Sequence, residues 1–212
     1  MKVSLYNVRQ EYAKEKLSVA ECANDPFSQF KHWLNQAIQS KVREATAMNL
    51  ATVDEDDKPS ARIVLLKELN NQGFVFFSNY NSRKGQCMKH NHNVALTFFW
   101  PELERQVRVE GHIELLDPKA SDEYFASRPY KSQIGAWASR QSKVLSSKAS
   151  LLTSFALVRA KNPNRVKRPS FWGGFLVIPN RVEFWQGRPS RLHDRVEYLL
   201  YDGKWKKHRL YP

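Results

Sequence analysis

The residues best suited to chemistry are cations, hydroxyls and aromatic rings gathered in short segments, of which the most unusual is FWQGRPSRLHDR at 184–195. Arg191, His193 and Arg195 alternate there, so in an extended segment their side chains face the same side. Such a face is costly unless an anion or an electron-rich ligand meets it. Trp185 adds a flat wall for an aromatic ring. The alternative is a solvated edge strand, which charged residues commonly protect from pairing, but the histidine and the tryptophan favour a functional segment.

A second candidate segment is SNYNSRKG at 78–85, where a strand is expected to lead into a helix. Backbone amides at a helix start, the cations Arg83 and Lys84, and a serine hydroxyl together suit a phosphate group. The spacing is not that of a Walker loop, because GxxxxGK[ST] is absent. An ordinary helix cap with a solvated charge pair explains the same residues equally well.

Two further segments carry cations beside hydroxyls. Arg62 and Lys67 flank an apolar strand and are five residues apart, so in a regular strand they point to opposite faces. They fit either two anion sites or two solvated strand ends, and the second is more common. Tyr124 and Arg128 share one face of a helix, and Ser132 follows after a turn, so one phosphate could accept from all three. The alternative has Tyr124 in the core and Arg128 at the helix C-terminus, and it is favoured without further information.

Several other chemistries are not expected. His90 and His92 have no third ligand at a known metal spacing, so no metal site is predicted. The chain has no GxSxG, HExxH or GxGxxG motif, which argues against a serine hydrolase, a zinc protease and a Rossmann dinucleotide site. Cys22 and Cys87 match no zinc or CxxC spacing, and we interpret them as reduced thiols of a cytosolic protein.

The composition favours an anionic partner. The 212 residues fit one domain and carry a net charge of +13, which suits nucleic acid, an acidic membrane surface or phosphorylated small molecules. The N-terminus has no secretory signal, and no apolar run approaches the ~20 residues needed to cross a bilayer, so a soluble cytoplasmic protein is expected. The basic stretch 159–168 raises nucleic-acid binding, but no such motif is present, and neither nucleic acid nor membrane is expected as a partner.

The elements that position these residues follow from periodicity and turn signals. Asp25-Pro26 and Asp117-Pro118 predict helix starts, and Asp202-Gly203 predicts a hairpin. Gly111, in mid-strand, predicts a bulge or a close backbone approach. Strands are predicted at NLATV, SARIVLLK, GFVFFS, VALTFFW, QVRVEGHIELL, GGFLVIP, VEFWQG, RVEYLLYDG and KWKKHRLYP, and helices after Asp25 and in three pieces within 118–161. Short strands that adjoin strands, with a helical insertion, indicate an antiparallel barrel. Residues 1–24 are expected to form a mobile arm.

Six segments together resemble the pyridoxine/pyridoxamine 5′-phosphate oxidase family over nearly the whole chain. They are RIVLLK, FFSNYNSRKG, LERQVRVEG, YFASRPYKSQIGAWASRQS, RPSFWGGF and EFWQGRPSRLHDR, and the last is highly specific. The resemblance implies a mainly β fold with helices, namely a homodimeric FMN-binding split antiparallel β-barrel. It further implies an N-terminal lid at 1–24, one domain at 25–212, and a dimer interface to which about 169–212 contributes.

The resemblance also implies site residues. For FMN it implies Arg62, Ile63, Val64, Leu65, Lys67, Phe77, Ser78, Arg83, Lys84, Gln106, Gln141, Ser142, Trp185 and Arg195. For the substrate it implies Arg9, Tyr12, Lys67, Tyr124, Arg128, Ser132, Arg191 and His193, with the last two as catalytic residues. Position 77 is a phenylalanine where some family members have tyrosine, so one hydroxyl contact is expected to be absent.

The activity that the resemblance implies is oxidation of pyridoxamine or pyridoxine 5′-phosphate to pyridoxal 5′-phosphate in vitamin B6 metabolism. A hydride would pass from C4′ to flavin N5, and O₂ would be reduced to H₂O₂. A flavin reductase-like or haem-handling barrel is the alternative. Lys67, Tyr124, Arg128 and Ser132 argue against it, because they would hold a substrate phosphate.

Overall fold

The computed structural model describes residues 11–212, and Arg9 therefore lies outside the described residues. The helices are α1 (Pro26–Gln39), α2 (Arg83–His90), α3 (Pro118–Ser127), α4 (Tyr130–Ala138) and α5 (Lys148–Lys161), with short 3₁₀ turns η1 (Pro101–Leu103) and η2 (Pro189–Arg191). The strands are β1 (Ala47–Val53), β2 (Pro59–Leu65), β3 (Glu68–Leu69), β4 (Phe74–Asn79), β5 (Asn93–Trp100), β6 (Arg105–Leu115), β7 (Trp172–Gln186), β8 (Asp194–Tyr201) and β9 (Lys204–Leu210). Within 11–212, no helix has the length and apolar character required to span a bilayer.

The helix starts are where the sequence predicts them. The Asp25 carboxylate accepts from the Ser28 amide at 2.9 Å, and the Asp117 carboxylate accepts from the Lys119 amide at 2.8 Å. Each aspartate is followed by the proline that begins its helix, α1 or α3. These caps satisfy amides that have no partner inside the helix, so the local sequence alone fixes both helix starts.

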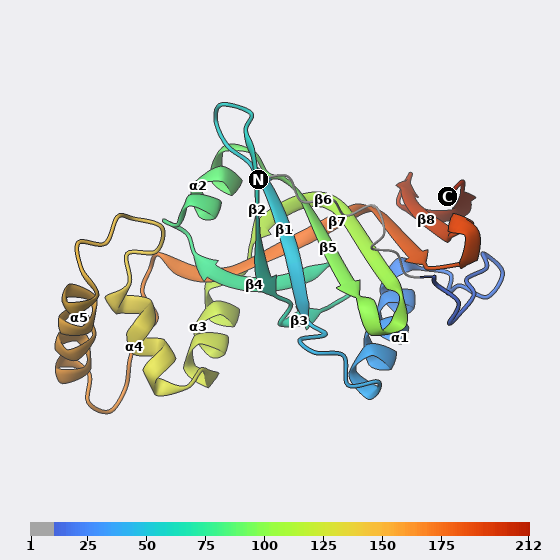
Figure 1. Cartoon of the computed structure of the whole chain (residues 1–212). Helices are drawn as coiled ribbons and strands as arrows, with labels where there is room; N and C mark the ends of the chain where they lie inside the picture. The colour runs from blue at the N-terminus through green and yellow to red at the C-terminus, as the bar shows by residue number, and fades with distance from the viewer. Residues whose placement is uncertain (1–10) are drawn as a thin grey trace, which may run out of the picture. The chain divides into compact units, whose positions relative to one another are not determined.

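The strands form one sheet over the described residues, in the order β2-β1-β5-β6-β7-β4-β3, with β8 paired to β7 and β9 to β8. The chain divides into two compact units. One contains the described residues up to Met48, together with Leu96–Glu110 and Asn180–Pro212, and the other contains Asn49–Ala95 and Gly111–Pro179. The first is called the C-terminal unit below and the second the helical unit. Both predicted main features, the predominance of strands and the helical insertion, are present (Figure 1).

In the C-terminal unit, β7, β8 and β9 form an antiparallel meander, and α1 packs by aromatic contacts. Trp33 of α1 meets Phe184 of β7 edge-on, with ring centroids 5.2 Å apart. The turn between β8 and β9 has Asp202 and Gly203 at positive φ, 47° and 72°, which confirms the predicted hairpin. The meander places residues 181–186 of β7 directly opposite 194–199 of β8.

In the helical unit, β4 pairs antiparallel with the first half of β7, and three helices pack around one apolar cluster. The cluster consists of the buried residues Phe125, Ile134, Val166 and Trp172. Helices α4 and α5 lie side by side (Figure 1). The predicted three helical pieces within 118–161 are α3, α4 and α5, and the stretch 162–171, which contains prolines and basic residues, is a loop.

Two predicted strands, GGFLVIP and VEFWQG, are one continuous strand, β7, which runs through Pro179. Proline removes a backbone donor but does not interrupt the strand here. Gly111 lies against this part of β7. A Cβ at Gly111 would lie 2.1 Å from the Ile178 carbonyl oxygen and 2.8 Å from the Pro179 Cα. The predicted close backbone approach at Gly111 is therefore confirmed, and a glycine is required there.

Candidate functional site

Arg128 is the clearest sign of a ligand site in the helical unit. It follows the last turn of α3, and its Nη1 is buried with no hydrogen-bond partner among the described residues. The guanidinium carbon lies 4.5 Å above the Trp172 ring and 5.5 Å from the Phe125 ring. Burial lowers the pKa of Arg128, and the nearby Tyr124 partly opposes that shift. A buried donor without an acceptor costs free energy, so an anionic ligand suits this position.

Tyr124 is held beside Arg128 by a stack of three parallel rings. The centroid of Tyr124 is 3.8 Å from that of Phe77 with an interplanar angle of 14°, and Phe77 is 5.6 Å from Trp172. A Cβ at Gly174 would lie 2.9 Å from Phe77, so the glycine leaves room for the stack. Burial raises the pKa of Tyr124, so its hydroxyl remains a hydrogen-bond donor at neutral pH.

The other residues predicted to hold the substrate phosphate lie on different elements. Ser132 is exposed in the first turn of α4, where its amide donates to the Pro129 carbonyl at 2.8 Å. Lys67 is exposed between β2 and β3, and its amide donates to the Val75 carbonyl at 2.9 Å. The strand β2 ends at Leu65. The prediction of one regular strand through residue 67 is therefore wrong, because β2 ends at Leu65 and Lys67 already pairs with Val75 of β4.

Arg62 is a partly buried cation on β2 that is held by uncharged groups. Its Nη1 donates to the Leu50 carbonyl at 3.0 Å and to the Thr52 hydroxyl at 2.8 Å, and its Nη2 donates to the Ser60 hydroxyl at 2.7 Å. No carboxylate in the described part of the chain forms an ion pair with it. Burial lowers the pKa of Arg62.

Lys84, in the first turn of α2, is a second such cation. Its Nζ lies 3.4 Å from the Ser82 hydroxyl and 3.3 Å from the Gln141 amide oxygen. Burial lowers its pKa, and the positive charge of Arg62 lowers it further. Two partly buried cations that repel each other fit a phosphate, which would compensate both charges. Lys84 and Gln141, both predicted to bind FMN, therefore lie together. Ser142, the next residue in the chain, has a left-handed backbone conformation with φ 71°.

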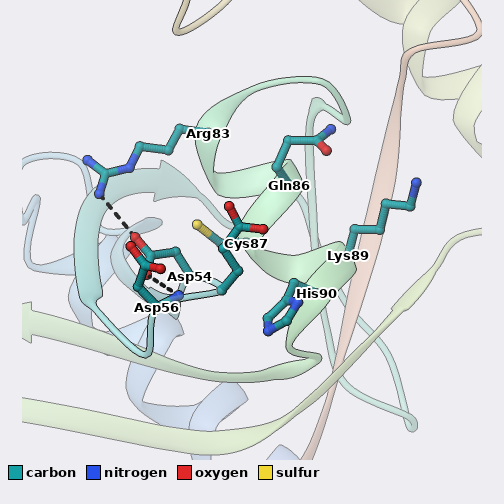
Figure 2. A pocket seen from close by; sticks show the side chains of 8 residues that line it. Asp54, Asp56, Arg83, Gln86, Cys87, Lys89 and His90 are labelled. Atoms are coloured by element: carbon teal, nitrogen blue, oxygen red, sulfur yellow. Dashed lines mark hydrogen bonds and ion pairs between the residues drawn. The ribbon is translucent and has the colours of Figure 1, made fainter.

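Arg83, the neighbour of Lys84, is engaged elsewhere. Its Nη2 lies 3.5 Å from the Asp54 carboxylate, and its side chain is 65% exposed. Figure 2 shows Arg83 reaching from α2 toward the β1–β2 turn, above a cleft of about 610 Å³. The pKa of Asp54 is lowered, first by the Lys58 amide and to a smaller degree by Arg83. A direct contact of Arg83 with FMN stays a prediction.

In the C-terminal unit, Tyr12, Trp185 and His193 form a cluster of rings. The centroid of Trp185 lies 4.7 Å from that of His193 and 5.7 Å from that of Tyr12. Gly187 admits Tyr12, because a Cβ there would lie 2.7 Å from the Tyr12 ring. The His193 Nδ1 accepts from the Arg188 amide at 3.1 Å.

The surroundings of His193 favour its neutral form. Burial lowers its pKa, and the charge of Arg191 lowers it further. Because Nδ1 accepts the backbone hydrogen bond, the single proton of the neutral ring lies on Nε2, which can donate to a ligand.

The predicted extended segment with Arg191, His193 and Arg195 on one side is wrong. Pro189–Arg191 forms the 3₁₀ turn η2, with Ser190 at φ 55° and Arg191 at φ 61°, and β8 begins at Asp194. Pro189 fixes a φ that suits the start of a turn, and strict alternation is lost there.

Arg195 lies on β8 directly opposite Trp185 on β7. Its Nε and Nη2 donate to the two carboxylate oxygens of Glu183 at 2.9 and 3.0 Å, and its Nη1 donates to the Tyr211 carbonyl at 2.7 Å. The hydrogen bond with Glu183 raises the pKa of Arg195. Sequence reasoning did not single out Glu183. The available signal was its spacing of two from Trp185, which places both on one face of the strand.

The remaining residues that were predicted to bind FMN lie on three different strands. Ile63 and Leu65 are exposed and Val64 is partly buried on β2, Ser78 is buried on β4, and Gln106 is partly buried on β6. Within residues 11–212, no group of histidine, cysteine and acidic residues could hold a metal ion.

Comparisons with known proteins agree on one family. A family model described as pyridoxamine 5′-phosphate oxidase matches residues 34–162, and a second, described as the pyridoxine 5′-phosphate oxidase C-terminal dimerisation region, matches 172–212. The chain is 60% identical over 210 residues to a pyridoxine/pyridoxamine 5′-phosphate oxidase of Actinobacillus pleuropneumoniae. It is 59% identical to one of Haemophilus influenzae. Both alignments cover 99% of this chain and 100% of the relative.

Solved structures show the same fold. PhzG from Burkholderia lata, in complex with tetrahydrophenazine-1-carboxylic acid, matches with a TM-score of 0.89 and 26% identity over 94% of this chain and 100% of that one. An FMN-binding protein of Nostoc punctiforme, related to pyridoxamine 5′-phosphate oxidase, matches with a TM-score of 0.73 and 15% identity over 89% of this chain and 98% of that one. The predicted fold, mainly β and of the split-barrel class, is confirmed.

Proposed function

Because this chain belongs to the pyridoxamine 5′-phosphate oxidase family, we propose that it oxidises pyridoxamine 5′-phosphate and pyridoxine 5′-phosphate to pyridoxal 5′-phosphate with FMN. The observation that carries the proposal is Arg128. Its buried, unpaired Nη1 beside the Tyr124 hydroxyl is a site for a phosphate ester rather than for an uncharged ring.

The residues present fit FMN. Arg62 and Lys84 are partly buried cations without a carboxylate partner among the described residues, and a flavin phosphate would compensate both charges. Gln141 already lies within reach of Lys84 and would complete that site. When bound, FMN supplies the hydride acceptor for the C4′ carbon of the substrate.

The residues of the chain would then bind and orient the substrate. Arg128 and Tyr124 would hold its phosphate, with Ser132 and Lys67 as further donors. Anchoring by the phosphate limits how the ring can turn, so the residues act mainly by orientation. Arg191 and His193 would lie over the pyridine ring. The neutral His193 would donate its Nε2 proton to that ring and would not act as a base through that atom.

We also propose that the protein is a homodimer with FMN clefts lined by both subunits. The match of 172–212 to a dimerisation region supports the dimer. In such a cleft, the flavin would contact Gln106, Trp185 and Arg195. Tyr12, which contacts Trp185, would belong to a lid over the substrate, together with Arg9, which lies outside the described residues.

The test is the visible absorption spectrum of the purified protein. The protein should show a flavin spectrum that pyridoxamine 5′-phosphate bleaches in the absence of oxygen, and admission of air should restore the colour and release H₂O₂. Pyridoxamine without its phosphate is the matched control and should bleach the flavin far more slowly, because Arg128 then has no anion to bind. A flavin that the phosphorylated substrate does not reduce would disprove the proposal.

A further inference from the structure

Glu183 is a buried acid that the proposed function leaves without a role. It lies on β7 with only 3% of its surface exposed. Two arginines contact its carboxylate: Arg195 with two hydrogen bonds at 2.9 and 3.0 Å, and Arg108 with one at 3.4 Å. A buried carboxylate is costly unless it is paired in this way.

The register of the strands makes this arrangement unusual. Glu183 on β7 lies directly opposite a second buried acid, Glu197 on β8, which is 4% exposed. Like charges directly opposite on neighbouring strands destabilise a sheet. Each acid has its own hydrogen-bond partners, Glu183 the two arginines above and Glu197 Arg181 and the His208 Nε2 at 2.8 Å, while Glu197 also acts on Arg195 through its charge.

The contact with Glu183 fixes the orientation of Arg195. Its Nε and Nη2 are both engaged by one carboxylate, and its Nη1 is engaged by the Tyr211 carbonyl. This leaves one hydrogen on each Nη for a ligand, pointing in directions that the carboxylate and the carbonyl determine. A planar guanidinium held by two parallel hydrogen bonds has little freedom to turn.

We propose that Glu183 is a positioning residue, which holds Arg195 in its orientation toward bound flavin and reduces the positive charge that Arg195 presents there. This inference rests on the proposed function, because it requires that Arg195 lies beside FMN. The carboxylate and the guanidinium form a nearly neutral pair. Removal of the Glu183 charge would leave Arg195 as an uncompensated cation.

The physical consequence is a change in the flavin's redox balance. Reduced flavin carries more negative charge than oxidised flavin, so an uncompensated Arg195 would stabilise the reduced form more. Glu183→Gln should therefore raise the midpoint potential of bound FMN. A tenfold change in the ratio of affinities for reduced and oxidised flavin corresponds to about 30 mV for a two-electron couple, and a shift of this order is expected.

The experiment compares Glu183→Gln with Glu197→Gln in the flavin-loaded protein. Glu197 is the comparison, because it is equally buried, lies opposite on the same sheet face and also loses an arginine partner, but makes no hydrogen bond with Arg195 and acts on it only through a weaker charge interaction than that of Glu183. The midpoint potential is measured by reductive titration with a reference dye. The affinity of the apoprotein for oxidised FMN is measured by quenching of flavin fluorescence, and thermal unfolding verifies that each variant folds.

Arg108→Gln provides the same test with the opposite sign. Arg108 competes with Arg195 for the Glu183 carboxylate and is 42% exposed, so its replacement should be tolerated by the fold. Glu183 would then compensate Arg195 more fully, and the potential should fall. This variant also keeps the inference testable if Glu183→Gln does not fold.

A rise for Glu183→Gln and a fall for Arg108→Gln, with a clearly smaller rise for Glu197→Gln, would support the inference. Equal shifts in Glu183→Gln and Glu197→Gln, or no shift in either Glu183→Gln or Arg108→Gln, would overturn it. A wild-type protein that binds no flavin would instead contradict the proposed function itself, so the two failures are distinguishable before any variant is made.

Discussion

Replacement of Arg128 by methionine should weaken catalysis and, at the same time, stabilise the ligand-free protein. Methionine keeps an unbranched side chain over the Trp172 ring but removes the charge and the donors. The Nη1 donor is buried without a partner in the described structure, and burial lowers the pKa of Arg128. In the wild-type protein one buried donor of Arg128 therefore has no acceptor until an anion binds.

The magnitudes follow from the contacts. Removal of an unsatisfied buried donor should stabilise the folded protein by ~1–3 kcal/mol. Loss of the cation–π contact with Trp172, at 4.5 Å, should destabilise it by ~0.5–1 kcal/mol. The free energy of unfolding should thus rise by up to ~2.5 kcal/mol, the largest difference between these two ranges. A charge-assisted hydrogen bond to phosphate contributes ~1.5–3 kcal/mol, so kcat/KM should fall by ~10- to 150-fold.

The assay is urea unfolding of the apoprotein with and without inorganic phosphate, followed by oxygen uptake with pyridoxamine 5′-phosphate for the flavin-loaded protein. Phosphate should stabilise the wild type through binding to the native state and should have a smaller effect on Arg128→Met. Lys131→Met, an exposed cation three residues along the chain, is the control and should change neither stability nor turnover. A less stable Arg128→Met, or one with unchanged kcat/KM, would refute the reasoning.

Three further predictions concern the cofactor site, the sheet and the pH dependence. Lys84→Ala should lose FMN during dialysis, because Arg62 alone would face the flavin phosphate, and absorbance of the retained flavin would show it; full retention would contradict the assignment. Gly111→Ala should destabilise the protein by ~1–3 kcal/mol in urea unfolding, because its Cβ would lie 2.1 Å from the Ile178 carbonyl oxygen; unchanged stability would contradict that contact. Arg191→Met should raise the pKa of His193, whose folded value is lowered by burial and by Arg191, so the acidic limb of the kcat/KM profile should move to higher pH. An acidic limb at unchanged pH would show that His193 is not the group that titrates there.

The sequence by itself determined the features that depend on near neighbours. The caps at Asp25 and Asp117 and the hairpin at Asp202-Gly203 were predicted, because a side chain reaches amides two or three residues away and a turn needs particular φ angles. The requirement for glycine at 111 was also predictable, although its partner was not.

Only the tertiary structure decided which cations need an anion. The sequence marked Arg62, Lys84 and Arg128 as candidate anion ligands but fitted ordinary solvated or capping cations as well, and their burial without carboxylates arises from packing of distant segments. The pair of Glu183 with Arg195 depends on the register of β7 against β8, and the turn at Arg191 removed an alternation that the sequence predicted. Burial and charge compensation are properties of the whole fold, because they depend on residues far apart in the chain, and local patterns do not encode them.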